Sequence, residues 1–224
     1  MRGLPVGIAI ALPVGVLALV WLGSLRFGTP RLHLSLAFVA GFLLLLLFGA
    51  ANAGVAALRD GVGGAWANGN LHVVAFGAPL LLAVAAIHHW APKIWGRPLG
   101  QGLGAVTFLA LLGGFLFMGL GAYLMGYDGA PAHVEDLTDS GWINFARLAA
   151  AGGILVIVGV LALVANLVSA GRGRGEPAGD DPYEGLTLEW ATTSPPPPPN
   201  FESVPEVRSD SPLLDLRNES GATA

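Results

Sequence analysis

Residues 32–58 read LHLSLAFVAGFLLLLLFGAANAGVAAL, a stretch that contains no charged residue from end to end. An α-helix rises about 1.5 Å per residue and the hydrocarbon layer of a bilayer is about 30 Å thick, so about 20 apolar residues cross it. This stretch is long enough. In lipid every backbone polar group needs a partner within its own segment, which a helix provides. The stretch therefore predicts a transmembrane helix.

Four further windows pass the same test, at residues 4–25, 71–90, 103–125 and 145–169. Glycine, proline or charged residues bound each window, and no charged side chain lies deep inside one. The many internal glycines and alanines would weaken a soluble helix, but in lipid they allow neighbouring helices to approach closely. The sequence therefore predicts an all-α integral membrane bundle of five helices over residues 1–170.

The composition supports a bilayer as the solvent. Hydrophobic residues make up 54% of the 224 and charged residues 12%, whereas soluble domains are roughly one quarter charged. The net charge of −4 comes from connections and the C-terminal region, so it does not indicate a nucleic-acid partner. Because the chain has no cysteine, thiolate metal sites and iron–sulfur clusters are excluded. A redox cofactor would need other ligands, histidine above all.

Basic residues are unequally distributed between the two sets of alternate connections. One set holds Arg26, Arg31, Lys93, Arg97, Arg172 and Arg174. The opposite set holds Arg2, Arg59 and Arg147 together with several acidic residues. The positive-inside rule then places the C-terminal tail in the cytoplasm and the N-terminus outside. An outside N-terminus would be natural for the second half of a larger membrane protein.

The composition changes at the end of the fifth window. Residues 171–224 are rich in glycine, arginine, aspartate, proline and serine, and they include the run Pro195 to Pro199. A proline run favours extended polyproline II and cannot form a helix. We expect an extended or disordered cytoplasmic tail, not a second domain.

Within this tail, residues 180–207 read DDPYEGLTLEWATTSPPPPPNFESVPEV. This segment resembles the C-terminal strap of subunit I of the haem-copper cytochrome c oxidases, in which Asp-Pro, Thr-Leu-Glu-Trp, Ser-Pro-Pro-Pro and Asn-Phe occur in this order. The resemblance extends upstream to LPVGIAI at residues 4–10, SLRFGTPRLH at 24–33 and HHWAPKIWG at 88–96. It implies that the five spans correspond to the last five of the twelve family helices.

In the family, the tenth helix carries a His-x-His pair that binds two haems. The first imidazole ligates the high-spin haem of the oxygen site and the second ligates the low-spin haem. The matching triplet here is Asn70, Leu71 and His72. An asparagine amide is a poor haem ligand where imidazole is a good one. The resemblance therefore implies that the oxygen site has lost its ligand, and that His72 is a candidate axial ligand of a low-spin haem.

Other family positions have changed in the same direction. The family's proton-uptake threonine and lysine correspond here to Val6 and Ala9. Its His-Asp pair near magnesium corresponds to Val62 and Gly63. Its two arginines that bind haem propionates correspond to Ala132 and His133. The copper-binding histidines of the family lie on earlier helices. The resemblance thus implies no catalytic residue, no metal site and no copper ligand in this chain, and haem at His72 is the one cofactor that it leaves open.

The remaining histidines have less specific interpretations. His88 and His89 lie beside Trp90, Lys93 and Trp95, which is typical of an interfacial anchor. His33 also fits a position at the membrane interface. His133 lies near Asp128, Glu135 and Asp136, which we interpret as solvated loop charge, with weak cation binding as the alternative. For His72 the alternative is an interfacial histidine retained by descent.

Three hypotheses about function follow. The first is a diverged subunit I-like component of a respiratory haem-copper oxidase complex in a prokaryotic plasma membrane, with a structural or accessory role and with lipid and other oxidase subunits as partners. The second is the C-terminal half of a split subunit I, which forms cytochrome c oxidase with a separate N-terminal chain. The third is a non-respiratory membrane interaction protein that uses the strap as a proline-rich docking peptide.

Overall fold

The structure is a computed structural model, and it describes residues 4–27, 33–137, 141–201 and 205–222. Within these ranges the regular secondary structure is entirely helical. The predicted start of the second span at Leu32 lies outside the described residues, as do Arg2, Arg31 and Asp139 from the charge distribution.

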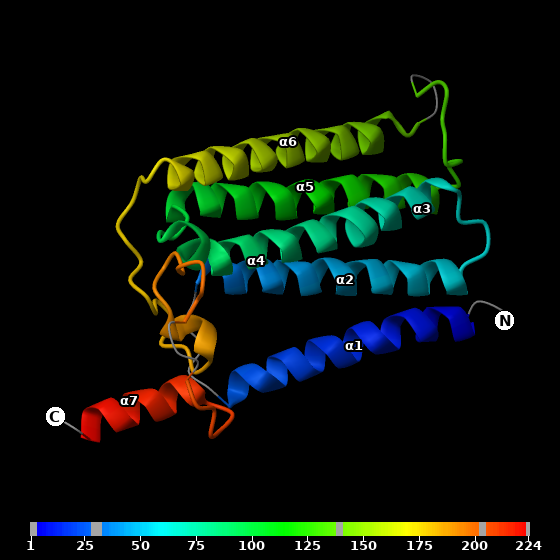
Figure 1. The fold of residues 1–224 in the computed structure, drawn as a ribbon. Coiled ribbons are helices and arrows are strands. Elements are labelled where there is room, and N and C mark those ends of the chain that lie inside the picture. The colour runs from blue at the N-terminus through cyan, green and yellow to red at the C-terminus, as the bar shows by residue number, and fades with distance from the viewer. Residues whose placement is uncertain (1–3, 28–32, 138–140, 202–204, 223–224) are drawn as a thin grey trace. The chain divides into compact units, whose positions relative to one another are not determined.

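The helices follow the predicted windows closely (Figure 1). In chain order they are α1 (Leu4–Arg26), α2 (Leu34–Leu58), α3 (Ala65–Asn70), the π-helix η1 (Leu71–Gly77), α4 (Ala78–Trp95), α5 (Gln101–Tyr127), α6 (Ile143–Gly171), the 3₁₀-helix η2 (Leu188–Ala191) and α7 (Pro212–Ala222). Because α3, η1 and α4 follow one another without a break, they form one continuous helical rod. The all-α prediction is confirmed.

Among the described residues, four helices are long and apolar enough to cross a membrane: α2, the rod Ala65–Trp95, α5 and α6. A shorter apolar helix, Leu12–Arg26, lies within α1, so the first span stays a prediction. The rod begins before the predicted start at Leu71. Its first turns, AWANGN, contain two asparagines and a glycine, which lower the hydropathy without preventing a helix.

The chain divides into two compact units. The first consists of residues Met1–Ala86 and Gly102–Leu163, and the second of Ile87–Gln101 and Val164–Ala224. The predicted boundary at residue 170 between the membrane bundle and the tail stays a prediction. The tail belongs to the same unit as the end of α4, which it contacts.

Glycines bring α5 and α6 into close contact in the first unit. A Cβ added to Gly152 would lie 2.5 Å from the carbonyl oxygen of Gly114, and a Cβ on Gly114 would lie 2.8 Å from that of Gly152. Real Cβ atoms do not approach backbone so closely. The two glycines therefore set the distance between these helices, as small residues do in membrane bundles.

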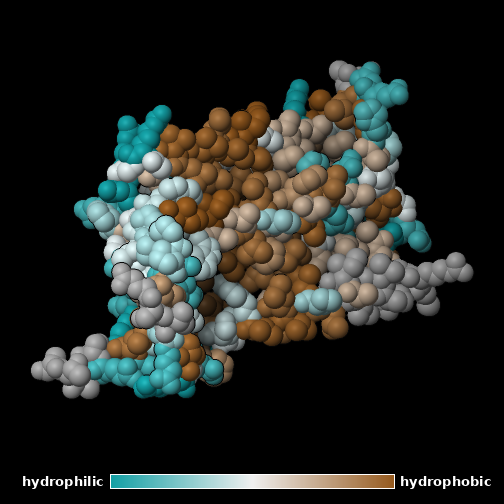
Figure 2. Space-filling model, viewed as in Figure 1, coloured by the Kyte–Doolittle hydropathy of each residue, from teal (hydrophilic) through white to brown (hydrophobic). Residues whose placement is uncertain are grey.

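The outer face of α6 carries large apolar side chains. The exposed ones are Ile154, Ile157, Val158, Val160, Leu161, Val164 and Val168. Figure 2 shows hydrophobic side chains gathered over this helix, and hydrophilic ones near the connection between α5 and α6. Such a face suits lipid or another apolar helix and is unsuited to water.

In the second unit the tail is folded against the end of α4. Lys93 Nζ donates hydrogen bonds to the carbonyl oxygens of Thr192 at 2.7 Å and of Asp180 and Thr193 at 3.3 Å, and to Ser194 Oγ at 3.2 Å. This buried ammonium group thus joins two separate parts of the tail to the helix.

Aromatic rings complete this contact. The ring of His89 stacks on Tyr183 with centroids 4.8 Å apart, and Trp90 stacks on the buried Trp190 with centroids 5.8 Å apart. His89 and Trp90, which the sequence suggested as interfacial anchors, therefore hold the strap. Whether they also lie at the headgroups stays a prediction.

The tail is less extended than its composition suggested. It contains the helical segments η2 and α7, and the proline run ends in a turn in which Asn200 N donates to Pro197 O at 2.8 Å. The sequence interpretation predicted the backbone of this region from its composition. It therefore missed the local contacts that allow short helices to form.

Candidate functional site

Asn70 and His72 lie where α3 passes into η1. Short π-helical segments inside α-helices occur frequently at functional sites. Residues two positions apart on a helix point to nearly opposite sides. The two residues that match the haem-binding pair of the family therefore face different surroundings.

The Asn70 side is occupied by protein. Tyr123 Oη on α5 donates a hydrogen bond to Asn70 Oδ1 at 2.9 Å. The Tyr123 ring packs against Trp66 and Phe48, with centroid distances of 5.0 and 5.5 Å. Gly69 leaves room for this ring, because an added Cβ would come within 2.5 Å of it. The amide oxygen of Asn70 therefore has its hydrogen-bond partner within the chain.

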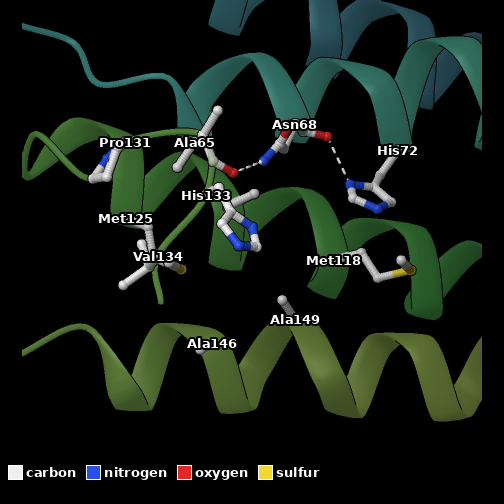
Figure 3. A pocket seen from close by; sticks show the side chains of 12 residues that line it. Ala65, Asn68, His72, Met118, Met125, Pro131, His133, Val134, Ala146 and Ala149 are labelled. Carbon is white, nitrogen blue, oxygen red and sulfur yellow. Dashed lines mark hydrogen bonds between the residues drawn. The ribbon is translucent and has the colours of Figure 1, made fainter. Parts of the chain in front are cut away.

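The His72 side is arranged differently. His72 Nδ1 lies 2.6 Å from the carbonyl oxygen of Asn68, one turn earlier on the helix. A carbonyl oxygen only accepts, so Nδ1 carries a proton, and in the neutral ring Nε2 is then the nitrogen with the lone pair. The ring points into a cavity (Figure 3). Such a hydrogen bond at one ring nitrogen is the usual way in which a protein fixes the other nitrogen as a metal ligand.

This cavity has a volume of about 260 Å³ and is lined by α3, η1, α5, α6 and the connecting residues 131–134. Small side chains form part of the walls, among them Ala65, Ala122 and Ala149. We call it the His72 cavity. The hydrogen bond from Asn68 Nδ2 to the Ala132 carbonyl oxygen, at 2.7 Å, ties the connecting residues to α3.

The structure brings His133 into the same cavity as His72 (Figure 3), together with Met118 and Met125 from α5. The sequence interpretation assigned His133 to solvated loop charge. No periodic pattern places a loop residue, so this contact could not be predicted. Met118 and Met125 are two helical turns apart, and that spacing is the one signal that could have paired them.

One acidic residue of this connection, Asp128, is hydrogen-bonded to a tryptophan. Asp128 Oδ2 accepts a hydrogen bond from Trp142 Nε1 at 2.8 Å. Over the ranges that the structure describes, no group of three or more His, Cys, Asp or Glu side chains could hold a metal ion.

The position that matches the family's His-Asp pair is closed by backbone. A Cβ on Gly63 would collide with the Ala130 carbonyl oxygen, and Gly63 N donates to the Gly126 carbonyl oxygen at 2.8 Å. Only glycine fits here. Of the positions that match the proton-uptake residues, Val6 has a side chain outside those described, and Ala9 is an exposed residue of α1.

The residues of this cavity could provide one ligand to a haem. His72 supplies an oriented imidazole with its lone pair available, which is the donor that haem iron prefers. The cavity is smaller than the roughly 300–1,000 Å³ of sites that enclose a drug-sized ligand. A haem held by His72 would therefore extend beyond the residues that line this cavity.

The apolar helices and the imidazole-lined cavity define a multi-pass helical membrane protein. Residues 4–169 match the model of one family, described as "Cytochrome C and Quinol oxidase polypeptide I". The chain belongs to this family.

Curated relatives agree with that membership. The chain is 32% identical to the "Probable cytochrome c oxidase subunit 1-alpha" of Streptomyces avermitilis, over 93% of this chain and 37% of the relative. It is 32% identical to the "Cytochrome c oxidase subunit 1" of Bacillus sp. (strain PS3), over 89% of this chain and 33% of the relative. A third relative, from Corynebacterium diphtheriae, is 30% identical over 92% of this chain and 38% of its own length. The chain thus spans between 33% and 38% of the length of these relatives.

Proposed function

We propose that this chain is a structural or accessory subunit I-like component of a respiratory haem-copper oxidase complex, and that it does not reduce oxygen. The observation that supports the proposal is the hydrogen bond between Tyr123 and Asn70. It lies at the position where the family pattern has the ligand of the oxygen site.

The chemistry of this position favours a packing role. An amide oxygen is a poor ligand for haem iron, and here it already accepts a hydrogen bond at 2.9 Å. If the amide turned away from α5 toward an iron atom, the Tyr123 hydroxyl would lose this partner. A polar group left unpaired in an apolar interior costs about 1–3 kcal/mol. The site that other family members use for oxygen is therefore used here to join the rod to α5.

The His72 side supports a narrower role in electron transfer. A low-spin haem, when bound, supplies one-electron chemistry. The contribution of this chain is the His72 Nε2 lone pair, and the Nδ1 hydrogen bond to Asn68 orients the ring and raises its basicity as a ligand. Any further ligand that such a haem needs would be supplied by another chain.

Partners and orientation follow from the same proposal. The apolar face of α6 contacts lipid or other oxidase subunits in the prokaryotic plasma membrane. The C-terminal tail lies in the cytoplasm and the N-terminus outside, as the distribution of basic residues predicts. Nucleic acid is not among the partners.

A split subunit I is the second candidate function. The observation that favours it is the partial match, in which the chain spans about 37% of a curated relative. A chain that supplies the remaining helices would then form cytochrome c oxidase with this one. Asn70 counts against this alternative, since dividing a polypeptide does not require the loss of a haem ligand.

The test is purification of the tagged full chain from its native membrane in mild detergent, with identification of the co-purifying chains and a reduced-minus-oxidised spectrum. We expect other oxidase subunits and a low-spin haem signal that is lost in His72→Ala. His33→Ala is the matched control, because His33 lies outside the cavity. A preparation without haem and without oxidase subunits would overturn the proposal. A partner that carries only the missing helices would favour the split enzyme.

A further inference from the structure

Of the four apolar spans, α6 is the least covered by the rest of the chain. In its apolar 18-residue window 11% of the residues are buried, against 33%, 39% and 39% in the other three spans. Figure 2 shows hydrophobic side chains gathered over this helix. A large apolar part of α6 is therefore left for lipid or for another chain.

The face of α6 that packs against α5 has a regular spacing. A Cβ placed at Gly114 would lie 2.8 Å from Val156 Cγ2, and one at Gly159 would lie 2.8 Å from Leu111 Cγ. The α6 residues that approach α5 in this way are Ala149, Gly152, Val156 and Gly159. Their intervals of three, four and three residues match the 3.5-residue repeat of left-handed helix packing. In the first compact unit α6 thus packs one neighbour in the manner of a coiled coil.

The opposite face of α6 repeats this spacing with exposed side chains. Arg147, Ala151, Ile154, Val158 and Leu161 follow one another at intervals of four, three, four and three residues, and all five are exposed. Ile154 and Leu161 are 64% and 63% exposed. Each of the last four lies two positions after a residue that meets α5, so it points to nearly the opposite side of the helix. We call these five residues the α6 stripe.

Arg147 is a charged residue at one end of this apolar stripe. It lies five residues after Trp142, which is about 7 Å along a helix axis. Tryptophan favours the level of the lipid headgroups, so the Arg147 backbone lies deeper. Its Nη1 is 3.5 Å from Asn144 Oδ1, which is long for a hydrogen bond. No carboxylate of the described residues forms an ion pair with it. Charged side chains at membrane depth are almost always paired, so Arg147 indicates a partner.

We propose that the α6 stripe docks a transmembrane helix of another chain, which has an apolar facing side and a carboxylate level with Arg147. The four apolar side chains of the stripe supply the packing surface. The Arg147 guanidinium donates two parallel hydrogen bonds to the carboxylate. Such a pair fixes the register of the two helices. The acidic residue lies at the end of α6 that the distribution of basic residues places outside.

Charge distinguishes this partner from the other occupants of the face. Lipid suits the four apolar side chains but gives Arg147 no fixed carboxylate. A second copy of this chain in the same orientation would bring Arg147 level with Arg147 of that copy, and like charges at an interface are costly. A helix with an acidic residue satisfies both parts of the stripe.

This inference rests on the proposed function in one respect, namely that the chain works in a complex of membrane subunits. It uses neither His72 nor haem. Haem and oxidase subunits in the preparation, with no chain docked at the α6 stripe, would remove this inference and leave the proposed function. A helix docked at the stripe in a preparation without haem or oxidase subunits would do the reverse.

The experiment introduces the photo-crosslinking residue benzoylphenylalanine into the full chain at position 154, 160 or 161 and irradiates native membranes. Val160 is the matched control, because it is apolar and 38% exposed but points about 100° away from Leu161. We expect positions 154 and 161 to link to one transmembrane segment of another chain, and position 160 not to link to it. Mass spectrometry of the linked peptides identifies this segment, which should contain Asp or Glu near its outer end.

A charge exchange then tests the ion pair. Arg147→Glu should lower the yield of the cross-link from position 161 at least about tenfold, because it places like charges together. Replacement of the partner's carboxylate by arginine should restore the yield. Arg147 is exposed and lies outside the contact with α5, so the fold of this chain is kept. Arg147→Gln removes the charge without adding repulsion and should give an intermediate yield.

Four results would overturn the proposal. Cross-links to lipid alone would show that the stripe faces the bilayer. Cross-links between two copies of this chain would show a homodimer instead. Equal cross-linking of positions 160 and 161 to the partner would show that no single face of α6 is docked. An unchanged yield in Arg147→Glu would show that no carboxylate pairs with Arg147.

Discussion

The strap region and the His72 cavity use polar side chains in opposite ways. In the second compact unit, which contains the strap, Lys93 donates hydrogen bonds to four oxygen atoms. In the same unit the Asn166 side chain accepts a hydrogen bond from Gly100 N at 2.8 Å and donates one to Gly100 O at 2.9 Å. In the cavity, His72 forms a hydrogen bond through Nδ1, and the rest of its ring points into the cavity. Polar groups that are satisfied within the chain stabilise the fold. The proposed role of His72 requires an available ring nitrogen, whereas the amide oxygen of Asn70 has its partner within the chain.

The contact between α5 and α6 is the place where a single methyl group should have the largest effect. In Gly152→Ala the new Cβ would meet Gly114 O at 2.5 Å and Met118 N at 2.6 Å, both of which are backbone atoms. We expect α5 and α6 to separate, with a loss of about 3 kcal/mol in unfolding free energy. Thermal unfolding in detergent measures this loss. Gly153→Ala has nothing within 4 Å of its Cβ and serves as the control. Equal stability of the two variants would show that α5 and α6 are not in close contact.

Loss of the Lys93 ammonium group should release the strap. Lys93→Met keeps the apolar stem but leaves the carbonyl oxygens of Thr192 and Thr193 without this donor. We expect a cost of about 2 kcal/mol, confined to the tail. Faster hydrogen exchange or proteolysis in residues 180–194 measures it, and the His72 cavity should be unaffected. Arg97→Met removes a half-buried side chain that bonds a single carbonyl, and should have little effect. A strap that remains protected in Lys93→Met would contradict this account.

The contact at Asn70 should contribute less, because it is a single neutral hydrogen bond. Tyr123→Phe removes the hydroxyl and keeps the ring packing against Trp66. We expect a loss of about 1 kcal/mol in unfolding free energy. A double-mutant cycle with Asn70→Ala isolates the pair, and interactions of this kind in membrane proteins average about 0.6 kcal/mol. A coupling energy of zero would mean that the hydrogen bond contributes nothing to packing.

The smallest effect is a dependence on alkaline pH in the strap. Burial raises the pKa of Tyr183 above its ordinary value of 10.0. A raised pKa in the folded state means that strap stability is constant below about pH 10 and falls as the pH rises above it. Ultraviolet difference absorbance of tyrosine ionisation, compared with Tyr183→Phe, measures this. If strap protection fell between pH 7 and 9, a group other than Tyr183 would be responsible.

The fold was largely predictable because a membrane span is a matter of length and composition. The windows at 103–125 and 145–169 lie within α5 and α6. The early start of the rod at Ala65 was missed because asparagine and glycine lower the hydropathy of AWANGN. The helices η2 and α7 were missed for a different reason, since composition alone does not report the tertiary contacts that order a tail.

Only the part of the candidate site that lies on one helix could be predicted from the sequence. The order of Asn70 and His72 in one triplet identified both the altered position and the retained imidazole. The partners of these residues come from elsewhere in the chain: Tyr123 from α5 and His133 from a connection. Hydropathy and residue spacing carry no information about such tertiary contacts. They depend on how closely glycines such as Gly152 allow the helices to pack.

The most direct test of the central claim is carbon monoxide binding. A high-spin haem with an open position binds carbon monoxide, whereas a low-spin haem with two axial ligands does not. The account predicts that the tagged full chain, purified with its partners, gives the same carbon monoxide difference spectrum with and without Asn70→Ala. A carbon monoxide signal that disappears in Asn70→Ala would show that Asn70 supports an oxygen-binding haem, and it would contradict the claim that this chain has lost the oxygen site.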